Sequence, residues 1–223
     1  MATTDDDHEL PYRRDAASAL NRLSHALVAH RASIDTLELI ATEAERLAIV
    51  IEKEAVRERQ VELLSNARVK KAIADGGNPA GPEGAFLDMF DDSPVSGSAN
   101  PLSVGLKLAA HADHVVGQVT LQPGWQGAPG RAHGGIVAAV VDEVLGAMLP
   151  VLEVVAFTGE LSLRYEAPCP MGVPLEFTAR KSDDEGRKIF LTCEGVGPDG
   201  VAFLRATSTF ITVDLSTFEG GAS

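Results

Sequence analysis

The spacing of apolar residues divides the chain into two parts with different periods. Residues 15–74 contain no proline or glycine, and apolar side chains recur there at steps of three and four, as in Leu20, Leu23 and Leu27. This spacing is typical of an amphipathic helix. From Leu102 onwards the period is two, which is typical of half-buried strands. The chain is therefore expected to combine an amino-terminal helical part with a sheet.

Six segments show the alternation of a strand, and most connections between them are short. Short connections favour antiparallel pairing, because parallel strands need a long crossover. Between the second and third segments, residues 136–149 are apolar on nearly every face of a helix, so this helix should be buried on all sides. These features predict an α+β fold, with one antiparallel sheet wrapped around a central buried helix. The strand segments are residues 102–108, 115–121, 155–165, 175–179, 189–193 and 201–213.

Two adjacent acids, Asp142 and Glu143, lie inside this apolar helix, which follows the glycine pair Gly134-Gly135. A buried carboxylate is strongly destabilising unless it is paired or hydrogen-bonded, so it rarely occurs without a reason. An apolar helix with glycines at its start and an acid two turns inside is typical of a reaction site.

Composition divides the chain into three regions. Residues 1–75 are an acidic tail, expected to be disordered over residues 1–10, followed by a helical extension. Residues 76–101 are rich in turn formers and are predicted to be a linker, and residues 102–215 are predicted to form the sheet domain. Basic and acidic residues nearly balance in the extension, so it presents no basic face for DNA. We therefore expect the extension to pack onto a partner surface or to support oligomerisation.

Charge and cysteine content limit where the protein is expected to act. The net charge of −13 disfavours binding to nucleic acid or to an anionic membrane surface. The helix over residues 136–149 is too short to cross a bilayer, so no membrane insertion is expected. Cys169 and Cys193 cannot form a disulfide framework, and the acidic first residues do not resemble a secretory leader. We therefore predict a cytoplasmic protein.

Three motifs around the central helix are spaced as in a known family. They are His133-Gly134-Gly135, Asp142 nine residues after the histidine, and Thr158 at the start of the next strand, sixteen residues later. Together with the strand order, this pattern resembles the hotdog fold and, within it, the acyl-CoA thioesterases of the PaaI/THEM4-like group. The resemblance covers residues 102–213 and leaves the helical extension outside.

The resemblance implies a substrate, a site and an assembly. It implies an acyl-CoA substrate, no cofactor, and an active site at a dimer interface, so a homodimer or a tetramer built from dimers is expected. Some members place an asparagine six residues before the histidine, where it polarises the substrate carbonyl. Gly127 occupies that position here, so this chain is similar to members that rely on backbone amides.

The start of the central helix supplies a candidate oxyanion donor. A helix start has free N–H groups and partial positive charge, and glycine lets a carbonyl approach, so the Gly135 amide, next to Gly134, is the expected donor. Asp142 returns to the same helix face about 10 Å further along the axis, whereas Glu143 is rotated away. A base must act within roughly 3 Å of the reacting atoms. The simplest arrangement is therefore a dimer in which Gly135 of one subunit faces Asp142 of the other.

The remaining candidate residues have less definite roles. Asp142 is expected to act either as a general base on water or as a nucleophile. Through the resemblance, Thr158 is expected to hold the water or orient Asp142 by hydrogen bonding, while His133 bonds the substrate or fixes the loop. The sequence contains neither the metal-binding His-Glu-x-x-His pattern nor the Gly-x-Ser-x-Gly of serine hydrolases, and we expect no metal ion.

The sequence therefore predicts an acyl-CoA thioesterase that converts a fatty or aryl acyl-CoA and water to the free acid and CoA. Two alternatives stay open: a non-catalytic hotdog module that binds acyl-CoA, and a hotdog enoyl-CoA hydratase or dehydratase. The combination of Asp142 with Thr158 argues against the first. The second usually has a catalytic histidine paired with an acid at a different spacing, which this sequence does not show.

Overall fold

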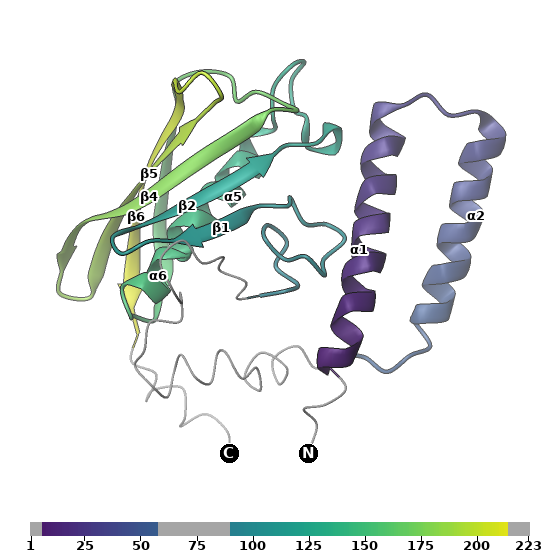
Figure 1. Ribbon diagram of the computed structural model, residues 1–223, viewed down its shortest axis with the longest axis horizontal. Coiled ribbons are helices and arrows are strands. Elements are labelled where there is room, and N and C mark those ends of the chain that lie inside the picture. Colours follow the sequence, from purple (N-terminus) through teal and green to yellow (C-terminus); the bar gives the residue numbers. More distant parts are fainter. Residues whose placement is uncertain (1–5, 58–89, 214–223) are drawn as a thin grey trace.

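The computed structural model describes residues 6–57 and 90–213 (Figure 1). Two long helices, α1 (Asp6–Ala29) and α2 (Ile34–Ile51), precede a sheet domain. The domain contains one longer helix, α5 (Gly134–Gly146), and two short ones, η1 (Pro123–Trp125) and α6 (Met148–Val151). Its strands are β1 (Lys107–Ala110), β2 (His114–Thr120), β3 (Ala156–Tyr165), β4 (Pro174–Glu185), β5 (Lys188–Val196) and β6 (Ala202–Thr212).

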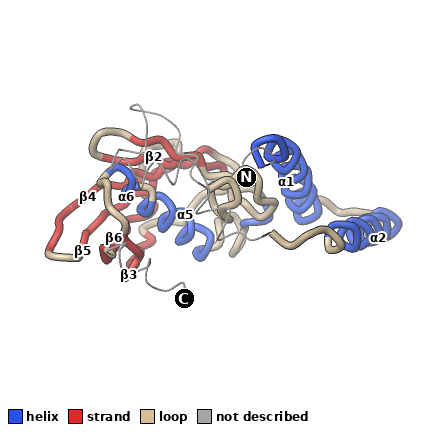
Figure 2. Tube along the Cα trace, turned by 90° about the horizontal axis from the view of Figure 1, so that it is seen from below, coloured by secondary structure: helices blue, strands red, loops and turns tan. Residues whose placement is uncertain are grey.

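The strands form one sheet in the order β1-β2-β4-β5-β6-β3, and every neighbouring pair is antiparallel. The turns after β4 and β5 use Gly186 and Gly200 at φ values of 58° and 72°, a conformation that favours glycine. Figure 2 shows the sheet curling around α5, with β2 on one side of the helix and β3 and β6 on the other. This architecture is the hotdog fold, and the predicted α+β arrangement is confirmed.

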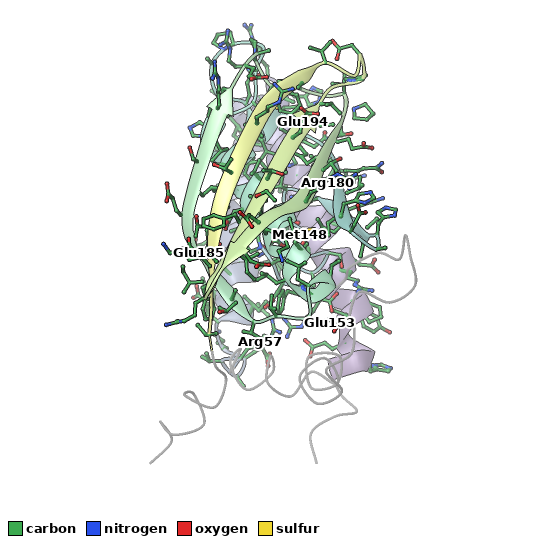
Figure 3. The ribbon with its side chains drawn as sticks, turned by 90° about the vertical axis from the view of Figure 1, so that its left-hand side faces the viewer. Arg57, Met148, Glu153, Arg180, Glu185 and Glu194 are labelled. Atoms are coloured by element: carbon green, nitrogen blue, oxygen red, sulfur yellow. The ribbon has the colours of Figure 1, made fainter. Side chains whose placement is uncertain are left out.

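Side chains in the central strands alternate between the core and the outer surface. In β4, Leu175 and Phe177 are buried while Glu176 and Arg180 are exposed. Figure 3 labels Arg180 and Glu194 on two neighbouring strands, and both side chains are exposed. This alternation explains why a period of two in the sequence locates β2, β4, β5 and β6.

Helix α5 packs its valine-rich side against the sheet. Gly117 of β2 allows a close approach, since a Cβ there would lie 2.6 Å from Val144 Cγ2. The prediction of burial on all sides is wrong for the opposite side, where Gly135 is exposed and Asp142 and Gly146 are half-buried. The reason is that the sheet covers only part of the helix circumference. The fully buried residues are Val137, Val140, Val141, Val144 and Leu145.

Within the described residues, one segment, Gly134–Val151, is long and apolar enough to cross a membrane by length and composition. In this fold it forms α5 and α6, whose apolar side chains contribute to the core of the domain. The central helix of a domain meets the same criteria, so the segment gives no separate support for a membrane-spanning role. The expectation of no membrane insertion stays a prediction.

The first strand is shorter than the sequence pattern predicts. Alternation predicts a strand over residues 102–108, but β1 begins at Lys107. Gly105 has a φ of 85°, which interrupts an extended run, and Leu102 is 68% exposed. Val104 and Leu106 are nevertheless buried. Here the period of two reflects burial of alternate side chains in an irregular segment.

The amino-terminal extension becomes helical earlier than predicted. Helix α1 begins at Asp6, so the expected disorder is wrong for residues 6–10, while residues 1–5 lie outside the described residues. Ser33 caps α2, because its Oγ accepts a hydrogen bond from the Thr36 N–H at 3.2 Å. The helical pattern of residues 58–74 also lies outside the described residues.

The apolar faces of α1 and α2 are largely uncovered. Among the side chains described in α1, Ala17 is buried, whereas Leu20 is 48% exposed. Helix α2 has no buried residue. The expected packing of these faces onto a partner surface stays a prediction.

The region predicted as a linker is described from Phe90 onwards, and residues 90–101, called the strap below, pack on the sheet domain. Val95 belongs to the core. Gly97 closes a tight turn in which a Cβ would lie 2.3 Å from the Ser93 N. Residues 76–89 lie outside the described residues, and the predicted domain boundaries stay predictions.

Candidate active site

Asp142 of α5 and Thr158 of β3 are in direct contact. Thr158 Oγ1 donates a hydrogen bond to Asp142 Oδ1 at 3.0 Å. The register between β3 and β6 shifts between Thr158 and Glu160, which leaves Gly159 in a bulge, and a bulge re-aims the side chains beside it. A Cβ at Gly159 would lie 3.0 Å from Ile211 Cγ1, so glycine suits this position. The tertiary structure thus joins two residues that the sequence motif singles out.

This pair lies on the wall of a cavity of about 250 Å³. Most lining side chains are apolar and come from the strap, α5, β3 and β6. An apolar cavity with a few convergent polar groups is the usual form of a small-molecule site. The lining residues are Phe90, Ser96, Leu108, Asp142, Glu143, Gly146, Ala147, Leu149, Ala156, Phe157, Thr158 and Phe210.

Glu143 also lines the cavity, but the strap holds its carboxylate. Its Oε1 accepts hydrogen bonds from the hydroxyl of Ser93, at 2.7 Å, and from that of Ser96. These donors stabilise a half-buried charge. The helical periodicity of the sequence already predicts that Glu143 and Asp142 point in different directions, and in the structure the two acids have different hydrogen-bond partners. The serines precede Glu143 by 50 and 47 residues, and no local sequence signal connects them with it.

His133 organises the start of α5. It is the N-cap residue, and its Nδ1 accepts a hydrogen bond from the Gly135 N–H at 3.1 Å. An imidazole nitrogen accepts only when it carries no proton. The N–H predicted as the oxyanion donor is therefore bonded to His133 in this structure, although Gly135 itself is exposed.

Tyr165, which the sequence does not single out as a site residue, contacts the same turn. Its hydroxyl donates a hydrogen bond to the Gly134 carbonyl at 2.7 Å. Burial raises the pKa of Tyr165, with a smaller contribution from Cys169, so the phenol stays protonated and able to donate near neutral pH. Tyr165 ends the strand that carries Thr158, but only the packing of β3 beside α5 brings it to the helix start.

The candidate oxyanion donor and the candidate base are apart within one chain. Gly135 and Asp142 are two turns of α5 apart, about 10 Å along the axis. Strand β3 is at the edge of the sheet, and most of its side chains are exposed. Because Thr158 bonds to Asp142, this edge strand lies beside the side of α5 that the sheet leaves uncovered.

The described residues contain no metal cluster and no activated thiol. No group of three or more His, Cys, Asp or Glu side chains is placed to hold a metal ion within residues 6–57 and 90–213. Cys169 and Cys193 are free and buried, and burial raises the pKa of each thiol to about 12. Neither is therefore a thiolate nucleophile at neutral pH.

Comparison with known proteins agrees with the kind of site that the geometry indicates. No family model matches the chain. It is 33% identical over 90 residues to the acyl-coenzyme A thioesterase THEM4 of Mus musculus, covering 40% of this chain and 39% of that protein. For the Xenopus laevis THEM4 the identity is 33% over 93 residues, covering 40% and 42%. The chain thus matches about two fifths of the length of these curated relatives.

A solved structure described as a thioesterase superfamily protein matches more of the chain. The TM-score is 0.72 at 28% identity, and the match covers 89% of this chain and 90% of the other. Since residues 90–213 make up little more than half of the chain, the match extends into the amino-terminal part. The chain is therefore similar in fold and sequence to hotdog-fold thioesterases. More specifically, it resembles the acyl-CoA thioesterases of the PaaI/THEM4-like group, which confirms the predicted resemblance.

Proposed function

We propose that the protein is an acyl-CoA thioesterase that hydrolyses a fatty or aryl acyl-CoA to the free acid and CoA. The observation that carries the proposal is the bond between Thr158 and Asp142 on the wall of an apolar cavity. The cavity offers apolar surface for an acyl group, and the Asp142 carboxylate on its wall would then face the thioester carbonyl. The similarity to proteins named acyl-coenzyme A thioesterase supports the same activity.

In this proposal Asp142 either activates a water molecule for attack on the thioester or attacks the thioester itself. As a general base it takes a proton from water, whose oxygen attacks the carbonyl carbon. The C–S bond then breaks, and the CoA thiolate takes up the proton. As a nucleophile the carboxylate attacks the carbonyl carbon, the C–S bond breaks, and the CoA thiolate leaves a mixed anhydride on Asp142. Water then hydrolyses the anhydride to the free acid and the Asp142 carboxylate, and the thiolate takes up the proton released. Thr158 orients Asp142 through the bond at 3.0 Å in either route.

The oxyanion is stabilised by the Gly135 N–H of a second subunit. Strand β3 supports this assembly, because one of its edges has no strand partner among residues 6–57 and 90–213, and an unpaired edge readily joins another strand. The uncovered side of α5 adjoins that edge, so a partner docked there would cover Asp142 and Gly135 together. A homodimer is the minimal unit, and a tetramer would be a pair of such dimers.

His133 and Gly134 shape the donor. The His133 ring occupies the Gly135 N–H in this structure, so an incoming carbonyl must share that N–H or displace the ring. The Gly134 carbonyl accepts a hydrogen bond from Tyr165, which fixes the backbone of the turn next to Gly135. We assign to His133 the role of positioning the turn, and to the Gly135 N–H the role of hydrogen-bonding the oxyanion.

We further propose a cytoplasmic protein with no nucleic-acid partner and no membrane insertion. Two buried, free cysteines are compatible with a reducing compartment. The net charge of −13 disfavours a phosphate backbone and an anionic bilayer alike.

The first experiment is a panel of acyl-CoA substrates of different chain length and aryl content, assayed for free thiol release. Asp142→Asn should lower kcat by at least about 100-fold, as expected for loss of a general base or nucleophile. Glu143→Gln, which keeps an acceptor for Ser93 and Ser96, is the matched control and should stay within about threefold of wild type. No thiol release from any substrate, or release that survives Asp142→Asn, would disprove the assignment.

The subunit arrangement has its own test. Gly135→Pro removes the N–H at a helix position that tolerates proline, so this variant and Asp142→Asn should each be inactive alone. If the site is shared, a mixed dimer has one intact site, and random mixing should restore about one quarter of wild-type activity. No recovery in mixtures that form hybrid dimers would show that both groups act within one chain.

A further inference from the structure

Helix α1 is attached to the sheet domain by polar contacts to two separate regions. In Figure 1, α1 lies beside the sheet domain, and α2 lies on the side of α1 that faces away from the domain. Asn21 Nδ2 donates hydrogen bonds to the carbonyls of Pro101, at 3.0 Å, and Ser103, at 2.9 Å. Further along α1, His25 reaches η1. The first contact holds the helix near the strap, and the second holds it to the loop that leads into α5.

The contact between His25 and η1 is specific in geometry. The Gly124 N–H donates a hydrogen bond to His25 Nδ1 at 3.1 Å. The imidazole also meets the Trp125 ring edge-on, with centroids 5.4 Å apart. A Cβ at Gly124 would lie 2.6 Å from His25 Nδ1, so the ring can approach this closely because residue 124 is glycine.

From η1 the hydrogen bonds continue to the candidate oxyanion donor. The Trp125 carbonyl accepts a hydrogen bond from the His133 N–H at 2.8 Å. The loop between them is closed by a bridge between Gln126 and Ala132. His133 Nδ1 then accepts from the Gly135 N–H at 3.1 Å. Three hydrogen bonds and two short covalent steps therefore connect α1 with the start of α5.

We propose that His25 is a positioning residue for the oxyanion donor, so that α1 is a working part of the active site and not a separate appendage. The proposal rests on the thioesterase function proposed above. His25 does not touch the substrate: it fixes η1, η1 fixes the backbone of His133, and His133 sets the direction of the Gly135 N–H.

The chemistry of this contact requires a neutral His25. A protonated Nδ1 would face the Gly124 N–H with a second donor, and the bond would be lost. Burial lowers the pKa of His25, which favours the neutral ring. An asparagine at position 25 would keep an oxygen acceptor close to the position of Nδ1, whereas alanine would remove the acceptor.

The test compares His25→Ala, His25→Asn and Asn21→Ala in the full chain. Asn21→Ala is the matched control, because it weakens attachment of the same helix to the same domain without touching the loop. Loss of one positioning hydrogen bond corresponds to about a fivefold fall in kcat. We expect that fall for His25→Ala with KM changed by less than about twofold, recovery of at least about half of kcat in His25→Asn, and unchanged kcat in Asn21→Ala. A kcat for His25→Ala equal to wild type, or an equal fall in Asn21→Ala, would overturn the proposal.

A second measurement does not depend on turnover. Amide hydrogen exchange over residues 123–135 should become faster in His25→Ala than in Asn21→Ala, because only the former loosens the loop. Trp125, the single tryptophan of the chain, should change its fluorescence in His25→Ala as a check that the contact exists in solution. If wild type releases no thiol, the proposed function fails while the exchange result still decides whether His25 holds the loop. Unchanged exchange in His25→Ala disproves the inference whatever the activity.

Discussion

Replacing Thr158 by valine tests the central pair of the site with little disturbance of the fold. Valine has nearly the shape of threonine and, like threonine, favours strands, so β3 and its bulge should persist. The substitution removes the hydroxyl that donates to Asp142 Oδ1 at 3.0 Å. Asp142 would then keep its place on α5 but lose the group that fixes its orientation.

The size of the effect follows from the kind of bond removed. A hydrogen bond to a charged group contributes roughly 1.5–3 kcal/mol, which corresponds to about a 10- to 100-fold change in rate. The side chain of Thr158 is exposed in the single chain, which favours the lower end of this range of rate changes. A partner subunit covering it would shift the value towards the upper end. Because the bond acts on the reacting carboxylate and not on the acyl group, kcat should fall while KM changes by less than about threefold.

The assay is steady-state thiol release with the best substrate of the panel, for wild type, Thr158→Val and Thr158→Ser. The serine variant keeps an Oγ and should retain most of the activity. Thermal unfolding of all three confirms that the domain is intact. A Thr158→Val enzyme with wild-type kcat, or a serine variant as weak as the valine variant, would refute the role given to this hydroxyl.

Three further predictions concern packing, the strap and Tyr165. Gly117→Ala should destabilise the domain by about 1–3 kcal/mol in a denaturant titration, because its Cβ would lie 2.6 Å from the fully buried Val144; an unchanged midpoint would contradict the packing described. The double change Ser93→Ala and Ser96→Ala removes both donors to Glu143 and should lower the free energy of unfolding by about 1–3 kcal/mol. Adding Glu143→Gln to this double variant should partly restore the stability. An unchanged free energy of unfolding in the double variant would show that Glu143 has other partners. Burial raises the pKa of Tyr165 above its usual value of 10.0, so the phenol absorbance transition that disappears in Tyr165→Phe should have a midpoint above that value. The stability from its bond to Gly134 should be complete below pH 10.0 and decline as pH rises through the higher pKa, and a midpoint at or below 10.0 would contradict this.

Local periodicity in the sequence predicts most of the secondary structure. Alternation locates β2, β4, β5 and β6, because each of these strands has one face on the core and one outside. The run of valines predicts α5, since a helix that fills a curled sheet must be apolar over most of its surface. The spacing of Asp142 from Gly135 also separates it from Glu143 by helical geometry alone. These features depend on neighbours within a few residues, so the sequence is sufficient to find them.

The contacts that complete the site depend on segments far apart in the chain, and only the tertiary structure decides them. Ser93 and Ser96 meet Glu143, Tyr165 meets Gly134, and His25 meets Gly124, 99 residues away. The sequence does not predict which distant group a hydroxyl or an imidazole will bond to, because either can bond to any free donor or acceptor that the fold brings near. Likewise, the exposed side of α5 follows from how far the sheet curls, which the apolar pattern of the helix does not encode. The sequence thus determined the elements and the acid, while the curvature of the sheet and the docking of α1 and the strap determined what surrounds them.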